Sequence, residues 1–116
     1  MDDLVTLSMP VYNGAPFVER ALRSALNQTF ENIEFLLVDD RGDDDSMDII
    51  RRVVAQHPRG KDVRIIEHPV NTGLGATRNT AIDHASGKYL FFMDSDDEIT
   101  EDAIEKLYRA MQETPV

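Results

Sequence analysis

Four short apolar runs alternate with four amphipathic segments along this chain of 116 residues. The runs are rich in Val, Ile, Leu and Phe and are mostly continuous, which is typical of strands buried on both faces of a parallel sheet. They cover residues 4–9, 33–38, 63–66 and 89–93. Because a strand followed by a helix returns in a right-handed crossover, the alternation predicts a parallel sheet covered by helices.

The segments between the runs carry apolar residues at helical spacing. In the first segment these residues share one helical face, and they are Phe17, Val18, Ala21, Leu22, Ala25 and Leu26. Residues 49–54 and 103–111 repeat the spacing, and the segment 77–85 is small and Ala-rich. Thr100 is expected to cap the last helix, with Glu101 and Asp102 in its first turn. The predicted fold is one Rossmann-like α/β domain over residues 1–116, with the order β-α-β-α-β-α-β-α.

Charge and composition narrow the possible partners. With 12 basic and 22 acidic residues the formal net charge is −10, so phosphates of nucleic acids and anionic membrane surfaces repel the chain, although simple solubility also explains an acidic balance. The absence of cysteine excludes disulfides and thiolate metal sites. No run of about 18 apolar residues exists, so we expect a cytoplasmic chain without a membrane span. A membrane association of a longer parent protein stays open.

Polar residues follow each of the predicted strands. The four groups are Pro10-Val11-Tyr12-Asn13-Gly14, Asp39-Asp40, Asn71-Thr72-Gly73 and Asp94-Ser95-Asp96-Asp97. The carboxyl ends of parallel strands meet at one edge of a sheet, and ligands bind outside that edge near the switch point in strand order. Since a helix-covered sheet needs no such polar edge for stability, the pattern predicts a binding site there.

Three carboxylates, those of Asp94, Asp96 and Asp97, directly follow the most apolar run. Two unit charges about 4 Å apart repel by roughly 4 kcal/mol at an effective dielectric of 20, so a cation would stabilise the cluster. Oxygen ligands suit Mg²⁺ or Mn²⁺. The competing interpretation places these carboxylates at the start of the last helix, where they would favour its dipole.

Asp39 and Asp40 end the second run. Asp39 adjoins the buried strand, and a partly buried carboxylate needs a hydrogen-bond donor, which a nucleobase N–H or a ribose hydroxyl would provide. The next three acidic residues, Asp43, Asp44 and Asp45, are expected to serve the solvated start of a helix that is capped near Ser46.

The segment Asn71-x-Gly73-x-Gly75 predicts a turn that leads into a helix. Helix N-termini attract phosphate, and Arg78 lies one turn further on, where its guanidinium could reach a diphosphate. A plain turn explains the glycines equally well, and Arg78 has a structural alternative as the charge partner of an aspartate. The three histidines lack metal-ligand spacing, and no metal role is expected for His57, His68 or His84.

Taken together, five segments resemble the N-terminal half of the family 2 glycosyltransferases, which have the GT-A fold. The segments are 8–13, 24–30, 37–40, 71–79 and 87–97, in the family's order and spacing. The resemblance extends from about residue 5 to residue 98 and implies a metal-dependent, inverting glycosyltransferase of the kind used in polysaccharide biosynthesis. The implied donor is a nucleotide-diphosphate sugar, and the implied cofactor is Mn²⁺ or Mg²⁺.

The resemblance also implies roles for individual residues. The implied nucleotide-binding residues are Pro10, Tyr12, Asn13, Asp39, Arg78 and Asp94. Of these, Asp39 would meet the base and Arg78 the base or the phosphates. The implied metal ligands are Asp96, Asp94 and Asp97. Asp94 and Asp96 form the Asp-x-Asp motif. Asp97 is the alternative metal ligand, because some members of the family bind the metal through the last two acidic positions.

Two departures from the family pattern stand out. The family commonly has Asp-Asp-Gly-Ser where this chain has Asp39-Asp40-Arg41-Gly42. This difference puts a contact between Asp40 and the nucleobase in question. Inverting transfer also needs a general base, which in this family comes well beyond the Asp-x-Asp motif. We therefore expect a donor-binding fragment without a catalytic residue, inactive or only hydrolytic alone. We further expect it to self-associate through its truncated edge.

Two other classes of protein share parts of this pattern. A haloacid-dehalogenase-type phosphatase also ends an apolar strand in Asp-x-Asp, but its motif opens the chain and carries Thr or Val where Glu98 stands here. A non-enzymatic receiver-like domain matches the length and the alternation, but its acidic pair follows the first strand. Binding of a nucleotide diphosphate with Mn²⁺, as opposed to acyl-phosphate chemistry, separates these alternatives.

Overall fold

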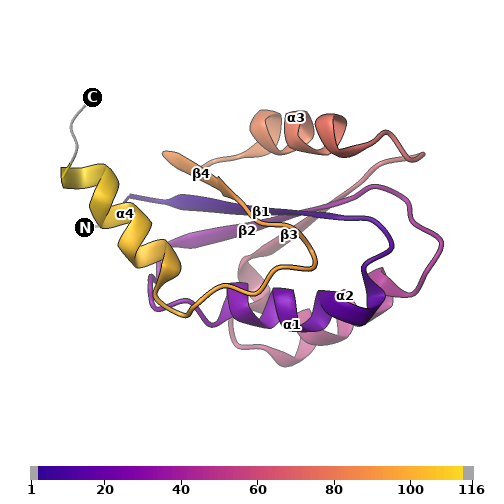
Figure 1. Ribbon diagram of the computed structural model, residues 1–116, viewed down its shortest axis with the longest axis horizontal. Coiled ribbons are helices and arrows are strands. Elements are labelled where there is room, and N and C mark those ends of the chain that lie inside the picture. The colour runs from indigo at the N-terminus through magenta and orange to yellow at the C-terminus, as the bar shows by residue number, and fades with distance from the viewer. Residues whose placement is uncertain (1–2, 114–116) are drawn as a thin grey trace.

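The computed structural model describes residues 3–113 and has the predicted alternation of strands and helices (Figure 1). The strands are β1 (Val5–Val11), β2 (Ile33–Asp39), β3 (Val63–Glu67) and β4 (Tyr89–Phe92). The helices are α1 (Ala15–Leu26), α2 (Ser46–Gln56), α3 (Leu74–His84) and α4 (Ala103–Glu113), with a short 3-10 helix η1 (Gly60–Asp62) before β3. The predicted α/β class is confirmed.

The sheet is parallel throughout, with the strand order β3-β2-β1-β4. β1 pairs with β2 along its whole length, from Val5 opposite Ile33 to Val11 opposite Asp39. The chain builds the sheet outward from β1 through β2 to β3 and then returns to place β4 on the other side of β1. The strand order therefore reverses between β1 and β4, where parallel sheets bind their ligands.

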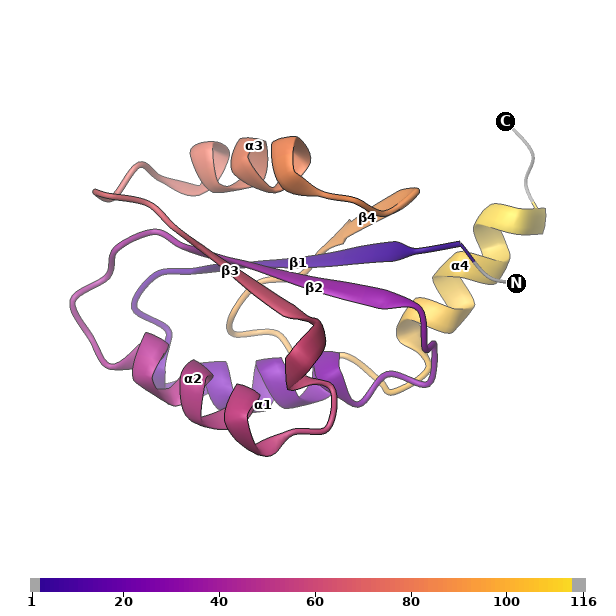
Figure 2. The same cartoon turned by 180° about the vertical axis from the view of Figure 1, so that it is seen from behind.

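Helices cover both faces of the sheet. α1 and α2 lie on one face and α3 lies on the other (Figures 1 and 2). The larger core joins alternate residues of β1 and β2 to the apolar sides of α1 and α2 and to Ile104 and Tyr108 of α4. The smaller core joins Leu36 and Val38 of β2 to Ala81 of α3. The predicted face of α1 is buried apart from Phe17, which lies at the flank of that face and is 54% exposed.

The two edge strands correct the expectation that all four strands are buried on both faces. No residue of β3 is fully buried, and the same holds for β4. In β4, Tyr89, Leu90 and Phe91 are only half-buried and Phe92 is 41% exposed. α3 packs mainly on β2 and β1, and its Arg78 side chain lies 5.8 Å from the centre of the Phe92 ring of β4. Within residues 3–113 the outer edge of β4 has no strand partner.

The start of the last helix also differs from the prediction. α4 begins at Ala103, whereas Thr100 was expected as its cap. The Thr100 carbonyl accepts the Ala103 N–H at 3.0 Å, so Thr100 instead begins a turn before the helix. The hydrogen bonds of the Asp102 carboxylate with Lys106 and Thr100 lower the pKa of Asp102.

Within residues 3–113, no helix combines the length and the apolar character that crossing a membrane requires.

Candidate functional site

The segments that follow the four parallel strands lie at one edge of the sheet, as the sequence predicts, and all four of these segments line one cavity. This central cavity has a volume of about 310 Å³. Its lining residues are Pro10, Tyr12, Asp40, Asn71, Gly73, Leu74, Thr77, Asp94 and Ser95. They come from the end of β1 and the residue after it, the residue after β2, the loop between β3 and α3, the first turn of α3, and the loop after β4. The central cavity therefore lies at the switch point of the sheet.

A second cavity lies between the end of β2 and the start of α2. This β2 cavity has a volume of about 220 Å³. Its lining residues are Val11, Asn13, Asp39, Arg41, Gly42, Asp44, Ser46, Met47, Arg51 and Glu67. The predicted nucleotide-binding residues are thus divided: Pro10, Tyr12 and Asp94 line the central cavity, and Asn13 and Asp39 line the β2 cavity. Pro10 and Val11 are neighbours in β1 but line different cavities, since successive strand residues point to opposite faces.

Asp39 is 7% exposed, as expected for a carboxylate at the end of a buried strand. Its Oδ1 accepts the backbone N–H of Arg41 at 3.0 Å. The chain therefore supplies one of the donors that a buried carboxylate needs. A carboxylate offers about four lone-pair sites, so Asp39 keeps acceptor capacity toward the β2 cavity that it lines.

The loop after β2 shows how the chain accommodates its departure from Asp-Asp-Gly-Ser. Arg41 stands where the family has glycine, and its φ of 57° is left-handed, a conformation that favours glycine. Gly42 approaches Asn13 so closely that a Cβ at position 42 would lie 2.9 Å from the Asn13 backbone nitrogen. The shifted glycine thus serves a close contact between two loops, while Arg41 takes the strained backbone position.

Asn13 connects the loop after β1 to the loop after β2. Its Oδ1 accepts the backbone N–H groups of Asp43 at 2.8 Å and of Asp44 at 3.3 Å. Asn13 itself has a φ of 51°, which asparagine tolerates better than most residues. The side-chain oxygen of Asn13 therefore shapes the β2 cavity, and its amide nitrogen remains the group that can donate to a ligand.

Asp44 serves the start of α2, as expected for this acidic stretch. Its carboxylate accepts the N–H of Ser46 at 3.0 Å, the hydroxyl of Ser46 at 2.5 Å and the N–H of Ala15 at 3.0 Å. Burial raises the pKa of Asp44, but these hydrogen bonds outweigh burial and hold it below its usual value. Ser46 was expected near the cap and is the first residue of α2.

Asp40 has a role that the sequence did not reveal. It is 3% exposed, and its carboxylate accepts the N–H and the hydroxyl of Thr72 at 2.9 and 2.8 Å and the N–H of Gly73 at 2.9 Å. His68 Nδ1 lies 2.9 Å from Asp40 Oδ1. Burial raises the pKa of Asp40, but hydrogen bonds from His68, Thr72 and Gly73 outweigh it and lower the pKa. Asp40 therefore holds the loop before α3 in place, and Gly73 of that loop lines the central cavity.

This arrangement changes the expectation for the start of α3. The N–H groups of Thr72 and Gly73, which precede the helix, are occupied by the Asp40 carboxylate. A phosphate there would meet a negative charge, so these two groups do not form the predicted phosphate site. Arg78 lines neither cavity, and its guanidinium lies 5.8 Å from the centre of the Phe92 ring.

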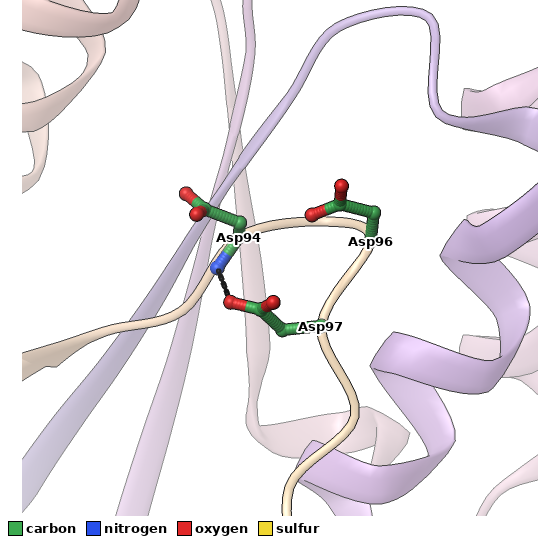
Figure 3. Close-up of side chains that lie close together, drawn as sticks. All are labelled: Asp94, Asp96 and Asp97. Atoms are coloured by element: carbon green, nitrogen blue, oxygen red, sulfur yellow. Dashed lines mark hydrogen bonds between the residues drawn. The ribbon is translucent and has the colours of Figure 1, made fainter.

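The three predicted metal ligands lie together on the loop after β4 (Figure 3). Asp94, Asp96 and Asp97 each offer a carboxylate oxygen, and these oxygens lie within 4.8 Å of one another. All three residues are exposed, and Asp97 Oδ2 accepts the Asp94 N–H at 3.3 Å. Among residues 3–113 no Lys or Arg pairs with them, so the alternative of Arg78 as their charge partner is not found. A cluster of exposed carboxylate oxygens without a protein counter-charge fits Mg²⁺ or Mn²⁺.

The chain belongs to glycosyl transferase family 2, whose family model matches residues 6–116. It is 39% identical over 103 residues to an uncharacterized glycosyltransferase of Haemophilus influenzae, covering 89% of this chain and 40% of that protein. It is also 39% identical over 102 residues to a chondroitin synthase of Escherichia coli, covering 88% of this chain and 14% of that protein. The chain therefore spans less than half the length of these relatives.

Solved structures agree with this membership. A crystal structure of S. aureus TarS in complex with UDP matches with a TM-score of 0.84 and 25% identity, over 95% of this chain and 32% of that one. The mannosyltransferase PcManGT from Pyrobaculum calidifontis, in complex with GDP-Man and Mn²⁺, matches with a TM-score of 0.83 and 27% identity, over 97% and 32%. The predicted family and the GT-A fold are confirmed, and the phosphatase and receiver alternatives fall away.

Proposed function

We propose that these residues bind a nucleoside-diphosphate sugar together with a divalent cation, as the donor-binding part of an inverting glycosyltransferase. The observation behind this proposal is the position of the acidic cluster. Asp94 lines the central cavity and shares its loop with Asp96 and Asp97, which no basic side chain neutralises within residues 3–113. A divalent cation held there would offset part of this negative charge and would leave coordination positions for the oxygens of a diphosphate.

The two cavities suggest how the donor divides between them. Tyr12 presents a ring that is 52% exposed at the central cavity, where it can pack against a flat nucleoside, and Pro10 lies beside it. Asp39 keeps a free acceptor site toward the β2 cavity, which suits a base N–H. In this arrangement Asn13 donates its amide N–H, and Asp94 faces the ribose or the diphosphate. Arg78 reaches the donor only by leaving Phe92, since it lines neither cavity.

The cation in this proposal is Mn²⁺ or Mg²⁺, held by Asp96 and Asp94, with Asp97 as a third ligand. When bound, such a cation offsets the negative charge that develops on the leaving diphosphate. Two similar structures support this proposal, since PcManGT was solved with GDP-Man and Mn²⁺ and S. aureus TarS with UDP.

We also propose that the base and the acceptor site are supplied by residues other than these 116. An inverting transfer needs a carboxylate free to take the acceptor proton. Asp40 and Asp44 are occupied by hydrogen bonds. Asp39 is assigned to the nucleobase and the Asp94 cluster to the cation. By itself the chain should therefore bind the donor nucleotide weakly and transfer no sugar. Relatives such as the chondroitin synthase of Escherichia coli make polysaccharide biosynthesis the expected setting.

Self-association belongs to the same proposal. The outer edge of β4 is unpaired within residues 3–113, and Phe92 of this strand is 41% exposed. Unpaired strand edges recruit further strands, so we propose that a second copy of this chain pairs there at high concentration.

Calorimetric titration with UDP and GDP tests the proposed function. We expect at least one of them to bind, and to bind more tightly when Mn²⁺ is present. Asp96→Asn should remove the gain from Mn²⁺, while Asp83→Asn, at an exposed aspartate of α3, should keep it. Absence of nucleotide binding with and without Mn²⁺ would contradict the proposal.

A further inference from the structure

The segment Ser24–Phe30 is one of the five segments that resemble the family, yet none of its residues lines the central cavity or the β2 cavity. Its Gln28 is nevertheless 5% exposed and fully engaged. Gln28 Nε2 donates to the Ser24 carbonyl at 3.0 Å and to the Thr100 carbonyl at 2.7 Å, and Oε1 accepts the Ile104 N–H at 2.9 Å. A buried amide that satisfies both ends in this way fixes the backbone that it contacts.

Two neighbours of Gln28 hold the same stretch of chain. The Ser24 hydroxyl accepts the Ile99 N–H at 3.2 Å, and the Thr29 N–H donates to the Glu101 carbonyl at 2.7 Å. We call Ser24, Gln28 and Thr29 the α1 clamp. Figure 1 shows the segment between β4 and α4 running beside α1, where these contacts form. The α1 clamp thus fixes the chain from Ile99 to Ile104.

The other end of the acidic loop is fixed by the sheet. The Met93 N–H donates to the Ser8 carbonyl at 2.9 Å, and Met93 is buried. Residues 94–98 bridge these two fixed points. Within that bridge, the Asp97 N–H donates to the Asp94 carbonyl at 3.1 Å, and the Asp94 N–H to the Asp97 carboxylate. Both anchors therefore help to set the distances between the three carboxylates.

We propose that Gln28, with Ser24, is a positioning residue for the divalent cation. The inference rests on the proposed function, because it takes the Asp94 cluster as the cation site. Three carboxylates within 4.8 Å repel one another before a cation arrives, and a loop free at one end would relax by spreading them. The α1 clamp opposes this spreading and keeps the carboxylates preorganised for the ion.

The test is a titration of the protein with Mn²⁺, in which the EPR signal of free Mn²⁺ reports binding. The titration is run without nucleotide and with saturating UDP or GDP. Gln28→Ala should raise the Kd of Mn²⁺ about tenfold, as expected when a group that supports metal ligands is lost. Ser24→Ala, which removes one hydrogen bond to the loop, should raise it less. The matched control is Gln56→Ala, at an exposed glutamine of α2 that contacts Arg23.

A second readout separates positioning from general stability. Without metal, the Kd of the nucleotide should change less than twofold in Gln28→Ala, since Gln28 lines neither cavity. All titrations are made well below the Tm of each variant, with folding checked by circular dichroism. If Gln28→Ala does not fold, Ser24→Ala decides the question. Wild-type Mn²⁺ affinity in the folded variants would overturn this inference alone, whereas failure of the wild-type chain to bind Mn²⁺ would overturn the cation site as well.

Discussion

Removing the carboxylate of Asp40 should loosen the wall of the central cavity and destabilise the fold. In Asp40→Ala the N–H groups of Thr72 and Gly73, the Thr72 hydroxyl and His68 lose their common acceptor. Hydrogen bonds to a charged group contribute about 1.5–3 kcal/mol each. These hydrogen bonds share one carboxylate, so their contributions are not additive. Because Thr72 is exposed, water can replace some of its lost hydrogen bonds. We expect the free energy of unfolding to fall by about 3 kcal/mol, or roughly 10 °C in Tm for a domain of this size.

The same carboxylate makes a definite prediction about pH. The folded-state pKa of Asp40 is lowered from an ordinary value of 3.8. Its ionised form therefore contributes stability that is fully present above pH 3.8 and is lost as the pH falls through the lower, folded-state pKa. Asp40→Asn lacks this titration. The difference in unfolding free energy between wild type and Asp40→Asn should be constant at neutral pH and should shrink below about pH 4.

Urea unfolding followed by circular dichroism, between pH 2.5 and 7, measures both effects. Asp43→Ala is the control, because Asp43 lies on the same loop with an exposed side chain. We expect this control to stay within about 0.5 kcal/mol of wild type. Two results would refute the role of Asp40 in holding the loop before α3. One is a loss of unfolding free energy below about 1 kcal/mol in Asp40→Ala. The other is a difference in unfolding free energy between wild type and Asp40→Asn that does not change with pH.

Three further predictions address the cation, the backbone and the sheet edge. A ligand at 100 times its Kd stabilises the folded state by about 2.7 kcal/mol, so Mn²⁺ with a nucleotide diphosphate should raise Tm by more than their separate effects combined. Asp96→Asn should remove most of this synergy, and a variant that keeps it would show that the ion is held elsewhere. Arg41→Gly should raise the unfolding free energy by up to about 1 kcal/mol by relieving the left-handed backbone, and a lowered value in urea unfolding would contradict that reasoning. Sedimentation should show self-association that Phe92→Lys weakens, and an unchanged distribution would exclude the β4 edge.

The order of the elements was predictable because apolar spacing depends only on neighbouring residues. The position of β4 was not, since Leu90-Phe91-Phe92 is as apolar as a central strand. Its edge position follows from the strand order. Its exposure follows from the position of α3, which packs mainly on β2 and β1. Likewise, local sequence suggested a cap at Thr100, but hydrogen bonds to Gln28 and Asp102 draw this residue into a turn.

The candidate site shows the same division between local and distant information. The cluster of Asp94, Asp96 and Asp97 lies within four residues, and its closeness could be predicted from sequence. The role of Asp40 depends on Thr72, 32 residues further along, and that of Gln28 on Ile104, 76 residues further along. Such pairs become neighbours only when the sheet and helices assemble, so no local pattern announces them.

The central claim is that this edge of the sheet binds the donor and its cation. A crystal structure of the chain with Mn²⁺ and whichever of UDP and GDP binds more tightly tests that claim most directly. Anomalous scattering locates the ion independently of the nucleotide. We predict one strong Mn²⁺ peak bound by Asp94 and Asp96, with or without Asp97, and a nucleotide whose diphosphate meets that ion and whose base lies near Asp39. A Mn²⁺ peak away from this cluster, or a nucleotide bound outside the central and β2 cavities, would contradict the assignment of this sheet edge as the donor site.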